Sequence, residues 1–307
     1  MSFVMKNFLK KLLKKSYILI GFFIFFWILR DVDFGHLKDS FSKINFLYFI
    51  LALSLYLPTM FVQSYRWKKI MDAQNIHYST KEAILMFGSA TLLGLITPGK
   101  IGDFSRVVHL KKDKHSLTKS FLNVFLDKFS DLVFAFLFVG ISLISLPLIP
   151  DLPFNFAVAA WWFILIIVIA VSIFFLIYKN QRLRNSFKIV LSELKKFNYK
   201  YLISIFSITV IIWSMYFIYF YLTAASIGLS AHVDFFYLSF TAALIVIATF
   251  LPISILNIGT RETILIFLLS PFGISKEQII LFSLLILIGL VALAVLSFFC
   301  WLKKPPL

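Results

Sequence analysis

The stretch LITPGKIGDFSRVVHL, residues 95–110, interrupts a chain that is otherwise apolar enough to lie in lipid. Pro98 and Gly99 break a helix, because proline has no N–H to donate and glycine adopts backbone angles that other residues avoid. Three charged residues follow, which are Lys100, Asp103 and Arg106. Non-helical backbone at membrane depth is tolerated only where it is buried in protein or lines a water-filled cavity. The stretch therefore predicts a polar site inside a membrane.

The composition predicts an all-α integral membrane protein. Of the 307 residues, 61% are hydrophobic, whereas soluble domains average about 45–50% apolar residues. Apolar runs long enough to cross the ~30 Å hydrocarbon core lie near 44–65, 121–149, 157–178, 201–225 and 278–302. A shorter run, 16–29, can cross when flanking Lys and Arg side chains reach the interface. We expect it to be a retained first span and not a signal peptide, because no small-residue cleavage site follows it.

The net charge of +16 does not indicate nucleic-acid binding, because the basic residues alternate with the apolar runs. Most of them lie in 1–15, 66–81, 111–119, 179–200 and 303–304, and few lie in the loops 30–43, 147–156, 226–234 and 270–277. Cytoplasmic loops carry an excess of Lys and Arg. The pattern predicts a multi-pass protein of the cytoplasmic membrane with both termini in the cytoplasm. Arg66 falls in one of the cytoplasmic clusters.

The same rule predicts two re-entrant hairpins. The segment that enters the membrane at residue 83 is followed by KKDKH at 111–115, which must again be cytoplasmic. The stretch between is too short and too charged for two spans, so we expect a hairpin over 83–110 that leaves on the side where it entered. A second hairpin is expected over 235–272, with its break in LPISILNIGTRE at 251–262. Six spans and two hairpins then place every basic cluster in the cytoplasm.

The two breaks predict an inverted-topology repeat of residues 1–150 and 151–307. The first break contains Pro98, Gly99 and Gly102, and the second contains Pro252 and Gly259. Interrupted segments at corresponding positions of two halves point to a transporter's midplane site. The alternative is an eight-span bundle in which Pro and Gly kink ordinary helices. That bundle would export two basic clusters, so the charge rule favours the hairpins.

Two basic segments, 1–15 and 179–200, repeat apolar residues at helical spacing. Amphipathic basic helices of this kind lie on anionic lipid. For the second segment, a cytosolic cap that packs on the spans is an equal alternative.

Ionisable residues fall at membrane depth in this topology. They are Lys100, Arg106, Lys128, Arg261, Asp103, Asp127, Asp131 and Glu262. An isolated charge there costs at least about 2.5–3.5 kcal/mol, so such residues are functional candidates. Asp127 and Asp131 lie one helical turn apart and repel each other unless cations meet them, and we expect Arg106 and Arg261 as their partners. A structural salt-bridge network is the alternative, although buried ion pairs seldom stabilise a fold more than apolar residues would.

The sequence shows no catalytic or metal-binding pattern. Cys300 is the only cysteine, and the five histidines lack the spacing of metal ligands. We therefore expect no enzymatic activity, no metal and no cofactor. Broken helices expose N–H groups that bind phosphate or carboxylate, and arginine matches the same oxyanions.

Several stretches resemble the transmembrane, flippase-like domain of the lysylphosphatidylglycerol synthase family. They are SYRWKKI (64–70), TPGKIGDFSRVVHL (97–110), NVFLDKFSDL (123–132) and LPISILNIGTRETILIFLLSPFGIS (251–275). Asp103 and Asp127 stand where the family usually has Glu, and Lys128 stands where Arg is usual. The aminoacyl-transferring synthase domain has no counterpart here. The resemblance therefore implies a stand-alone module that handles lipid and does not synthesise it.

The leading hypothesis is a flippase or transporter for an anionic lipid, either an aminoacyl-phospholipid or a polyprenyl-phosphate-linked sugar. A separate lipid-modifying synthase or glycosyltransferase could supply that lipid. The alternatives are a proton-coupled carrier of a small organic anion and a non-transporting membrane scaffold.

The hypothesis gives each buried charge a role. Lys100, Arg106 and Arg261 would hold the phosphate, and Asp103 and Glu262 would orient the two arginines. Asp127, Lys128 and Asp131 would balance charge, and the two aspartates could share a proton and couple movement to the proton gradient.

Overall fold

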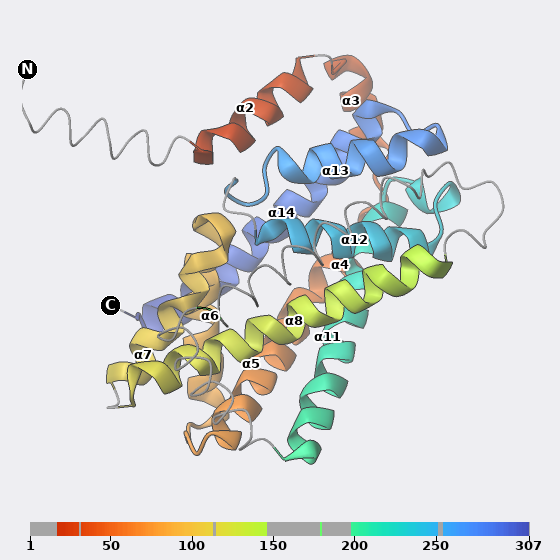
Figure 1. Ribbon diagram of the computed structural model, residues 1–307. Helices are drawn as coiled ribbons and strands as arrows, with labels where there is room; N and C mark the ends of the chain where they lie inside the picture. The colour runs from red at the N-terminus through yellow and green to blue at the C-terminus, as the bar shows by residue number, and fades with distance from the viewer. Residues whose placement is uncertain are drawn as a thin grey trace, which may run out of the picture.

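The computed structural model describes residues 17–30, 32–112, 115–145, 179, 198–250 and 254–306, and within these ranges the chain is helical without a strand (Figure 1). The helices are α2 (Tyr17–Leu29), α3 (Phe34–Ser42), α4 (Phe46–Ser54), α5 (Tyr56–Ala73), α6 (Thr80–Ile96), η1 (Pro98–Ser105), α7 (Arg106–Lys112), α8 (Leu117–Ser145), α11 (Tyr199–Ala225), η3 (Leu229–Ala231), α12 (Phe235–Thr249), α13 (Thr260–Leu269), η4 (Ser270–Phe272) and α14 (Lys276–Lys303). The prediction of an all-α protein is confirmed.

Three stretches of the described chain are long and apolar enough to span a membrane, namely Phe46–Ala73, Tyr199–Ala225 and Lys276–Lys303. The last two coincide with the predicted spans at 201–225 and 278–302, and the first overlaps the predicted span at 44–65 and extends beyond it. The 29-residue α8, Leu117–Ser145, covers most of the predicted run at 121–149 and carries the charged residues of that region. The predicted span at 157–178, the amphipathic segment at 1–15 and most of the amphipathic segment at 179–200 lie outside the described residues. The chain is a multi-pass membrane protein, and the number of six spans stays a prediction.

The first of these spans contains a kink between α4 and α5. Pro58 has no N–H to donate to the carbonyl four residues earlier, which belongs to Ser54, and α4 ends at Ser54. The helix resumes as α5 and continues to Ala73, past the predicted end of the span at residue 65. This continuation corrects the sequence-based placement of Arg66, which is buried in the protein and not in a cytoplasmic loop.

The first predicted break folds the chain back on itself. Gly99 and Lys100 have positive φ angles of 62° and 54°, and η1 then lies against the end of α6. A Cβ on Gly102 would stand 2.2 Å from the carbonyl of Leu93, so only glycine allows this approach. The ring of Tyr78, before α6, lies 6.4 Å from the ring of His115, after α7. The two ends of the segment therefore meet, as in a hairpin.

The second predicted break has the same form. Pro252 lies outside the described residues, but Leu256, Asn257 and Gly259 have positive φ angles of 53°, 60° and 87°. The Tyr237 hydroxyl, near the start of α12, donates to the carbonyl of Leu268, near the end of α13, at 3.0 Å. This segment is therefore also a helical hairpin with its break at the tip.

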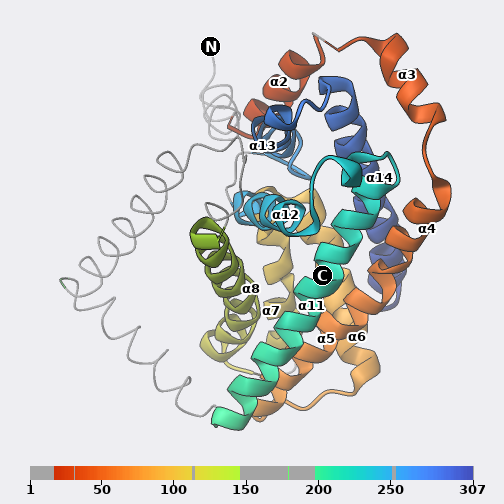
Figure 2. The same cartoon turned by 90° about the vertical axis from the view of Figure 1, so that its right-hand side faces the viewer.

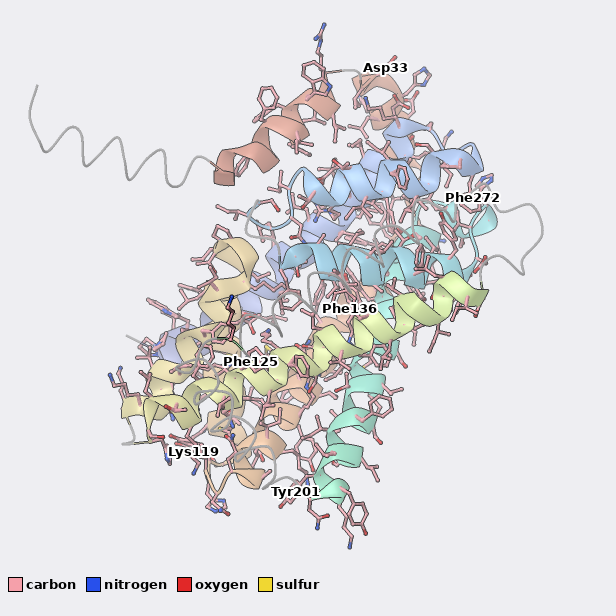
Figure 3. The ribbon with its side chains drawn as sticks, viewed as in Figure 1. Asp33, Lys119, Phe125, Phe136, Tyr201 and Phe272 are labelled. Carbon is pink, nitrogen blue, oxygen red and sulfur yellow. The ribbon has the colours of Figure 1, made fainter. Side chains whose placement is uncertain are left out.

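The remaining helices hold the two hairpins together. α14 packs against α6 of the first hairpin and α13 of the second, and α8 packs against α7 of the first hairpin and α12 of the second (Figures 1 and 2). The largest core cluster joins α11, α12 and α14 through Phe217, Phe240, Phe282 and their neighbours. Aromatic side chains on the outer faces of α8 and α11 are exposed, among them Phe125 and Tyr201 (Figure 3). An exposed apolar exterior of this kind is the surface that a membrane covers.

Candidate functional site: a cavity between the two helix breaks

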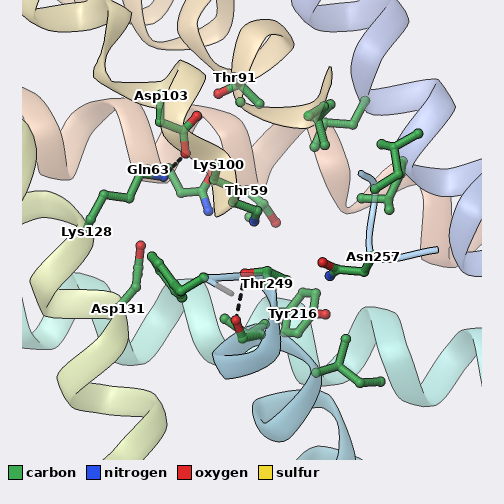
Figure 4. Close-up of a pocket in the computed structure, with 18 of the residues that line it drawn as sticks. Thr59, Gln63, Thr91, Lys100, Asp103, Lys128, Asp131, Tyr216, Thr249 and Asn257 are labelled. Atoms are coloured by element: carbon green, nitrogen blue, oxygen red, sulfur yellow. Dashed lines mark hydrogen bonds and ion pairs between the residues drawn. The ribbon is translucent and has the colours of Figure 1, made fainter. Parts of the chain in front are cut away.

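A cavity of about 190 Å³ lies between the tips of the two hairpins (Figure 4). The first break lines it with Thr97, Gly99, Lys100 and Asp103, and the second lines it with Ser254, Leu256, Asn257 and Arg261. α5, α6, α8, α11, α12 and α14 supply the other walls. Ligand sites for drug-sized molecules measure about 300–1,000 Å³, so the cavity suits a headgroup-sized polar moiety.

Each break presents a polar side chain from the second of two consecutive left-handed residues. The pairs are Gly99–Lys100 and Leu256–Asn257, and the side chains of Lys100 and Asn257 both lie at the cavity (Figure 4). A non-glycine residue with positive φ is uncommon, and such residues cluster at functional sites. Lys100 makes no side-chain ion pair within the part of the chain that the structure describes.

Behind one wall, a buried ionic network joins four helices. Arg66, on α5, places Nη1 2.6 Å from Asp131 Oδ1 and 3.1 Å from Thr209 Oγ1, and Nε donates to Asp127 Oδ1 at 3.0 Å. Arg106, on α7, donates through Nη1 to Asp127 Oδ2 at 2.8 Å. Two cations therefore meet the two neighbouring carboxylates of α8, which removes their mutual repulsion.

The guanidinium of Arg106 is enclosed by aromatic rings. Its Cζ lies 4.7 Å from the ring centroid of Phe87 and 5.0 Å from that of Trp67, and the residue is 1% exposed. Cation–π contacts of this kind strengthen when desolvated. Arg106 is therefore held against α8 and does not line the cavity.

A further ion pair joins the first break to α8. Lys128 Nζ lies 2.5 Å from Asp103 Oδ2, and both residues line the cavity (Figure 4). A Cβ on Gly94 would stand 2.1 Å from Asp103 Oδ1. The absence of that Cβ gives the carboxylate its place against α6.

The second break has its own buried polar group. Arg261 Nη2 lies 2.8 Å from Glu262 Oε1, and Arg261 Nε donates to Ser283 Oγ at 2.7 Å. Ser283 in turn donates to the Glu262 carboxylate, and Glu262 Oε2 accepts from the N–H of Gly259 at 2.6 Å. Glu262 therefore both caps the N-terminus of α13 and holds the guanidinium of Arg261 in place. Nη1 of Arg261 is buried and makes no hydrogen bond with any residue that the structure describes.

Of the charged residues selected from the sequence, the cavity wall contains Lys100, Asp103, Lys128, Asp131 and Arg261. Arg106, Asp127 and Glu262 do not line it. Arg106 donates to the carbonyl of Asp103, and Glu262 pairs with Arg261, whereas Asp127 pairs with the two arginines behind the wall. Arg106 meets Asp127 as expected, but the partner of Asp131 is Arg66 and not Arg261. Sequence reasoning missed Arg66 because it read SYRWKKI as a cytoplasmic charge cluster. The sequence did contain one signal for it. Asp127 and Asp131 need two cationic partners, and only Arg106 was assigned to them correctly.

Three tyrosines of the cavity were also missed, namely Tyr56, Tyr216 and Tyr219. The rings of Tyr56 and Tyr219 lie 4.8 Å apart, and a Cβ on Gly289 would stand 2.7 Å and 2.5 Å from their hydroxyls. Gly289, on α14, therefore leaves the space that both hydroxyls occupy. Nothing in a sequence with 18% aromatic residues distinguishes these three. Among the described residues, no group of three or more His, Cys, Asp or Glu is placed to hold a metal ion.

Apolar spans, two broken helical hairpins and a charged cavity between them define a polytopic membrane protein with an internal polar site. The chain belongs to the family of the lysylphosphatidylglycerol synthase transmembrane region, whose family model matches residues 17–300. No curated protein and no solved structure matches the chain.

Proposed function

We propose that this protein moves an anionic lipid, an aminoacyl-phospholipid or a polyprenyl-phosphate-linked sugar, across the cytoplasmic membrane. The observation that carries the proposal is the cavity at which both helix breaks meet, where Lys100 makes no ion pair and Arg261 Nη1 makes no hydrogen bond within the described part of the chain. Helix breaks that face each other at one site are typical of secondary transporters. The protein acts as a flippase and not as an enzyme.

The cavity side chains take distinct parts. Lys100 and Arg261 contact the phosphate, because they bring the unused cationic donors to the cavity. Glu262 orients Arg261, and Asp103 orients Lys128. Arg106 does not line the cavity and acts through Asp127, whose carboxylate it holds in place. It is therefore a positioning residue.

Asp127 and Asp131 balance the charge of Arg66 and Arg106 in this account. Each carboxylate accepts hydrogen bonds from a buried guanidinium, so both already have cationic partners in the folded protein. Charge balance is therefore a better-supported role for them than the sharing of a proton.

The size of the cavity determines how a lipid would use it. A volume of about 190 Å³ accepts a headgroup, whereas the acyl or polyprenyl chains remain in the surrounding bilayer. Rocking of one hairpin repeat against the other would expose the headgroup to each side in turn. A separate synthase or glycosyltransferase would supply the lipid, and both termini would face the cytoplasm.

The test is lipid translocation by the purified protein in proteoliposomes. We expect the protein to accelerate the loss of fluorescence when dithionite reduces phosphatidylglycerol that carries a nitrobenzoxadiazole label on one acyl chain. Arg261→Gln removes a charged hydrogen-bond donor worth about 1.5–3 kcal/mol, so the rate should fall at least about tenfold. Arg30→Gln, the same change at an exposed position, is the control and should keep the rate.

Three results would contradict the proposal. Liposomes with wild-type protein that bleach no faster than empty liposomes would favour the scaffold. Accumulation of a small organic anion under a proton gradient, without lipid movement, would favour the carrier. An Arg261→Gln protein that loses its monodisperse elution in proportion to its activity would assign Arg261 to folding alone.

A further inference from the structure

Two cationic donors at the cavity have no partner in the described part of the chain. Arg261 is 2% exposed, and its Nη1 makes no hydrogen bond with the described residues. The ammonium group of Lys100 makes no ion pair with them. A buried donor left unpaired is unfavourable. The cavity therefore favours a ligand that supplies acceptor atoms and negative charge.

The carboxylates at the cavity are already engaged. Asp103 pairs with Lys128, as described above, and Asp131 Oδ2 accepts from Arg66 Nη2 at 2.9 Å. Glu262 is occupied by its hydrogen bonds at the start of α13. An ammonium group on a ligand would therefore meet no unpaired carboxylate among the described residues of the cavity, and it would meet the charge of Lys100. Juxtaposed like charges are unfavourable at a binding interface.

The other polar groups of the cavity are neutral. The side-chain amides of Gln63 and Asn257 line it (Figure 4), and neither makes a side-chain hydrogen bond with the described residues. An amide both donates and accepts, so it matches a hydroxyl group, which does the same. The tyrosine hydroxyls add further groups of this type.

We propose that the headgroup taken by this cavity is a phosphodiester with an uncharged, hydroxyl-rich substituent, such as glycerol or a sugar, and that a substituent with an ammonium group is rejected. The proposal rests on the function proposed above and excludes one of the two lipid classes considered there, the aminoacyl-phospholipids. Lys100 and Arg261 would hold the phosphodiester, and Gln63, Asn257 and the tyrosines would hold the hydroxyls.

The experiment compares three acyl-labelled lipids in the same dithionite assay with wild-type protein. Phosphatidylglycerol has a small uncharged polyol, phosphatidylinositol has a large uncharged polyol, and lysyl-phosphatidylglycerol has a large substituent with two ammonium groups. We expect both uncharged polyol lipids to move at least about tenfold faster than lysyl-phosphatidylglycerol, which corresponds to about 1.4 kcal/mol of discrimination.

The outcomes separate this inference from the proposed function. Movement of lysyl-phosphatidylglycerol at the rate of phosphatidylglycerol or faster would overturn the inference and leave the flippase intact. Movement of phosphatidylglycerol alone would also overturn it, because headgroup size and not charge would then be selected. Failure of all three lipids to move would overturn the proposed function itself.

Two variants of Lys100 test the physical cause. Lys100→Gln removes the unpaired charge and should reduce the preference for the uncharged polyol lipids. Lys100→Glu supplies the free anion that the cavity lacks and should shift the preference toward lysyl-phosphatidylglycerol. Elution of each variant as a folded, monodisperse protein is the control. An unchanged preference in a folded Lys100→Glu protein would contradict the role of this side chain.

Discussion

Arg66 shows how one side chain can determine a buried network. It is 1% exposed and bridges Asp127 and Asp131 of α8, so its removal would leave two neighbouring carboxylates with Arg106 as their only close arginine in the described chain. Removing one partner of a buried ion pair is far more costly than removing an exposed pair.

We predict that Arg66→Gln destabilises the protein by about 3–5 kcal/mol, seen as a lower midpoint of thermal unfolding in detergent. Lys68→Gln is a matched control on the same helix. Lys68 is partly exposed and pairs with Asp72 one turn away, so its loss should cost at most about 1 kcal/mol. Equal shifts for the two variants would contradict the buried network.

Gly289 gives a second prediction at the scale of a residue. A methyl group there meets the hydroxyls of Tyr56 and Tyr219, and overpacking of this type costs about 1–3 kcal/mol. We predict that Gly289→Ala displaces the two rings and slows lipid movement, while Ala294→Gly, a small change elsewhere on α14, does not. Dithionite assays of the two variants check this prediction. Equal rates would show that the tyrosine positions do not matter.

The helix breaks were predictable because their causes are local. Proline removes a donor and glycine permits a positive φ, so TPGKIG indicates a break wherever it lies. The ends of the spans were less predictable. α5 continues beyond its apolar run because Arg66 pairs with carboxylates on another helix, α8. The pairing of Arg66, the space at Gly289 and the convergence of three tyrosines depend on tertiary packing. No short-range pattern encodes them.

At the scale of an element, a substitution at Gly102 provides a test of how the first hairpin packs. Its Cα lies against the backbone of Leu93 and Gly94, which cannot yield as a flexible side chain can. We predict that Gly102→Ala opens the contact between η1 and α6, with a loss of stability and of lipid movement. Ile101→Ala, at the exposed neighbouring position in η1, should preserve both. A stable and active Gly102→Ala protein would contradict the close packing of the hairpin.

The start of α6 gives a pH prediction. Hydrogen bonds from Lys304 and Ser79 hold the pKa of Glu82 below its usual value, so the ionised form is favoured in the folded protein. The stabilisation is present above the usual carboxyl pKa of about 4.3 and is lost as pH falls through the lowered value. Thermal unfolding between about pH 7 and pH 3.5 should therefore show a loss in wild type that Glu82→Gln lacks. Parallel profiles would contradict the pairing with α14.

At the scale of the whole molecule, the two hairpins open toward opposite ends. Lys119, just after the first hairpin, and Phe272, at the end of the second, lie far apart along the direction of α8 (Figure 3). This arrangement supports the proposed inverted repeat, in which each hairpin enters from its own side of the membrane. The cavity between the tips would then lie near the midplane.

The most direct measurement is the accessibility of the two hairpin ends from each side of the membrane. Single cysteines at Lys112 and Ser275, each in a Cys300→Ser background, would be labelled with a membrane-impermeant maleimide in intact cells and in inverted vesicles. The account predicts that Lys112→Cys reacts only in inverted vesicles and Ser275→Cys only in intact cells. Reaction of both positions from the same side would contradict the inverted hairpins, and with them the midplane anion site.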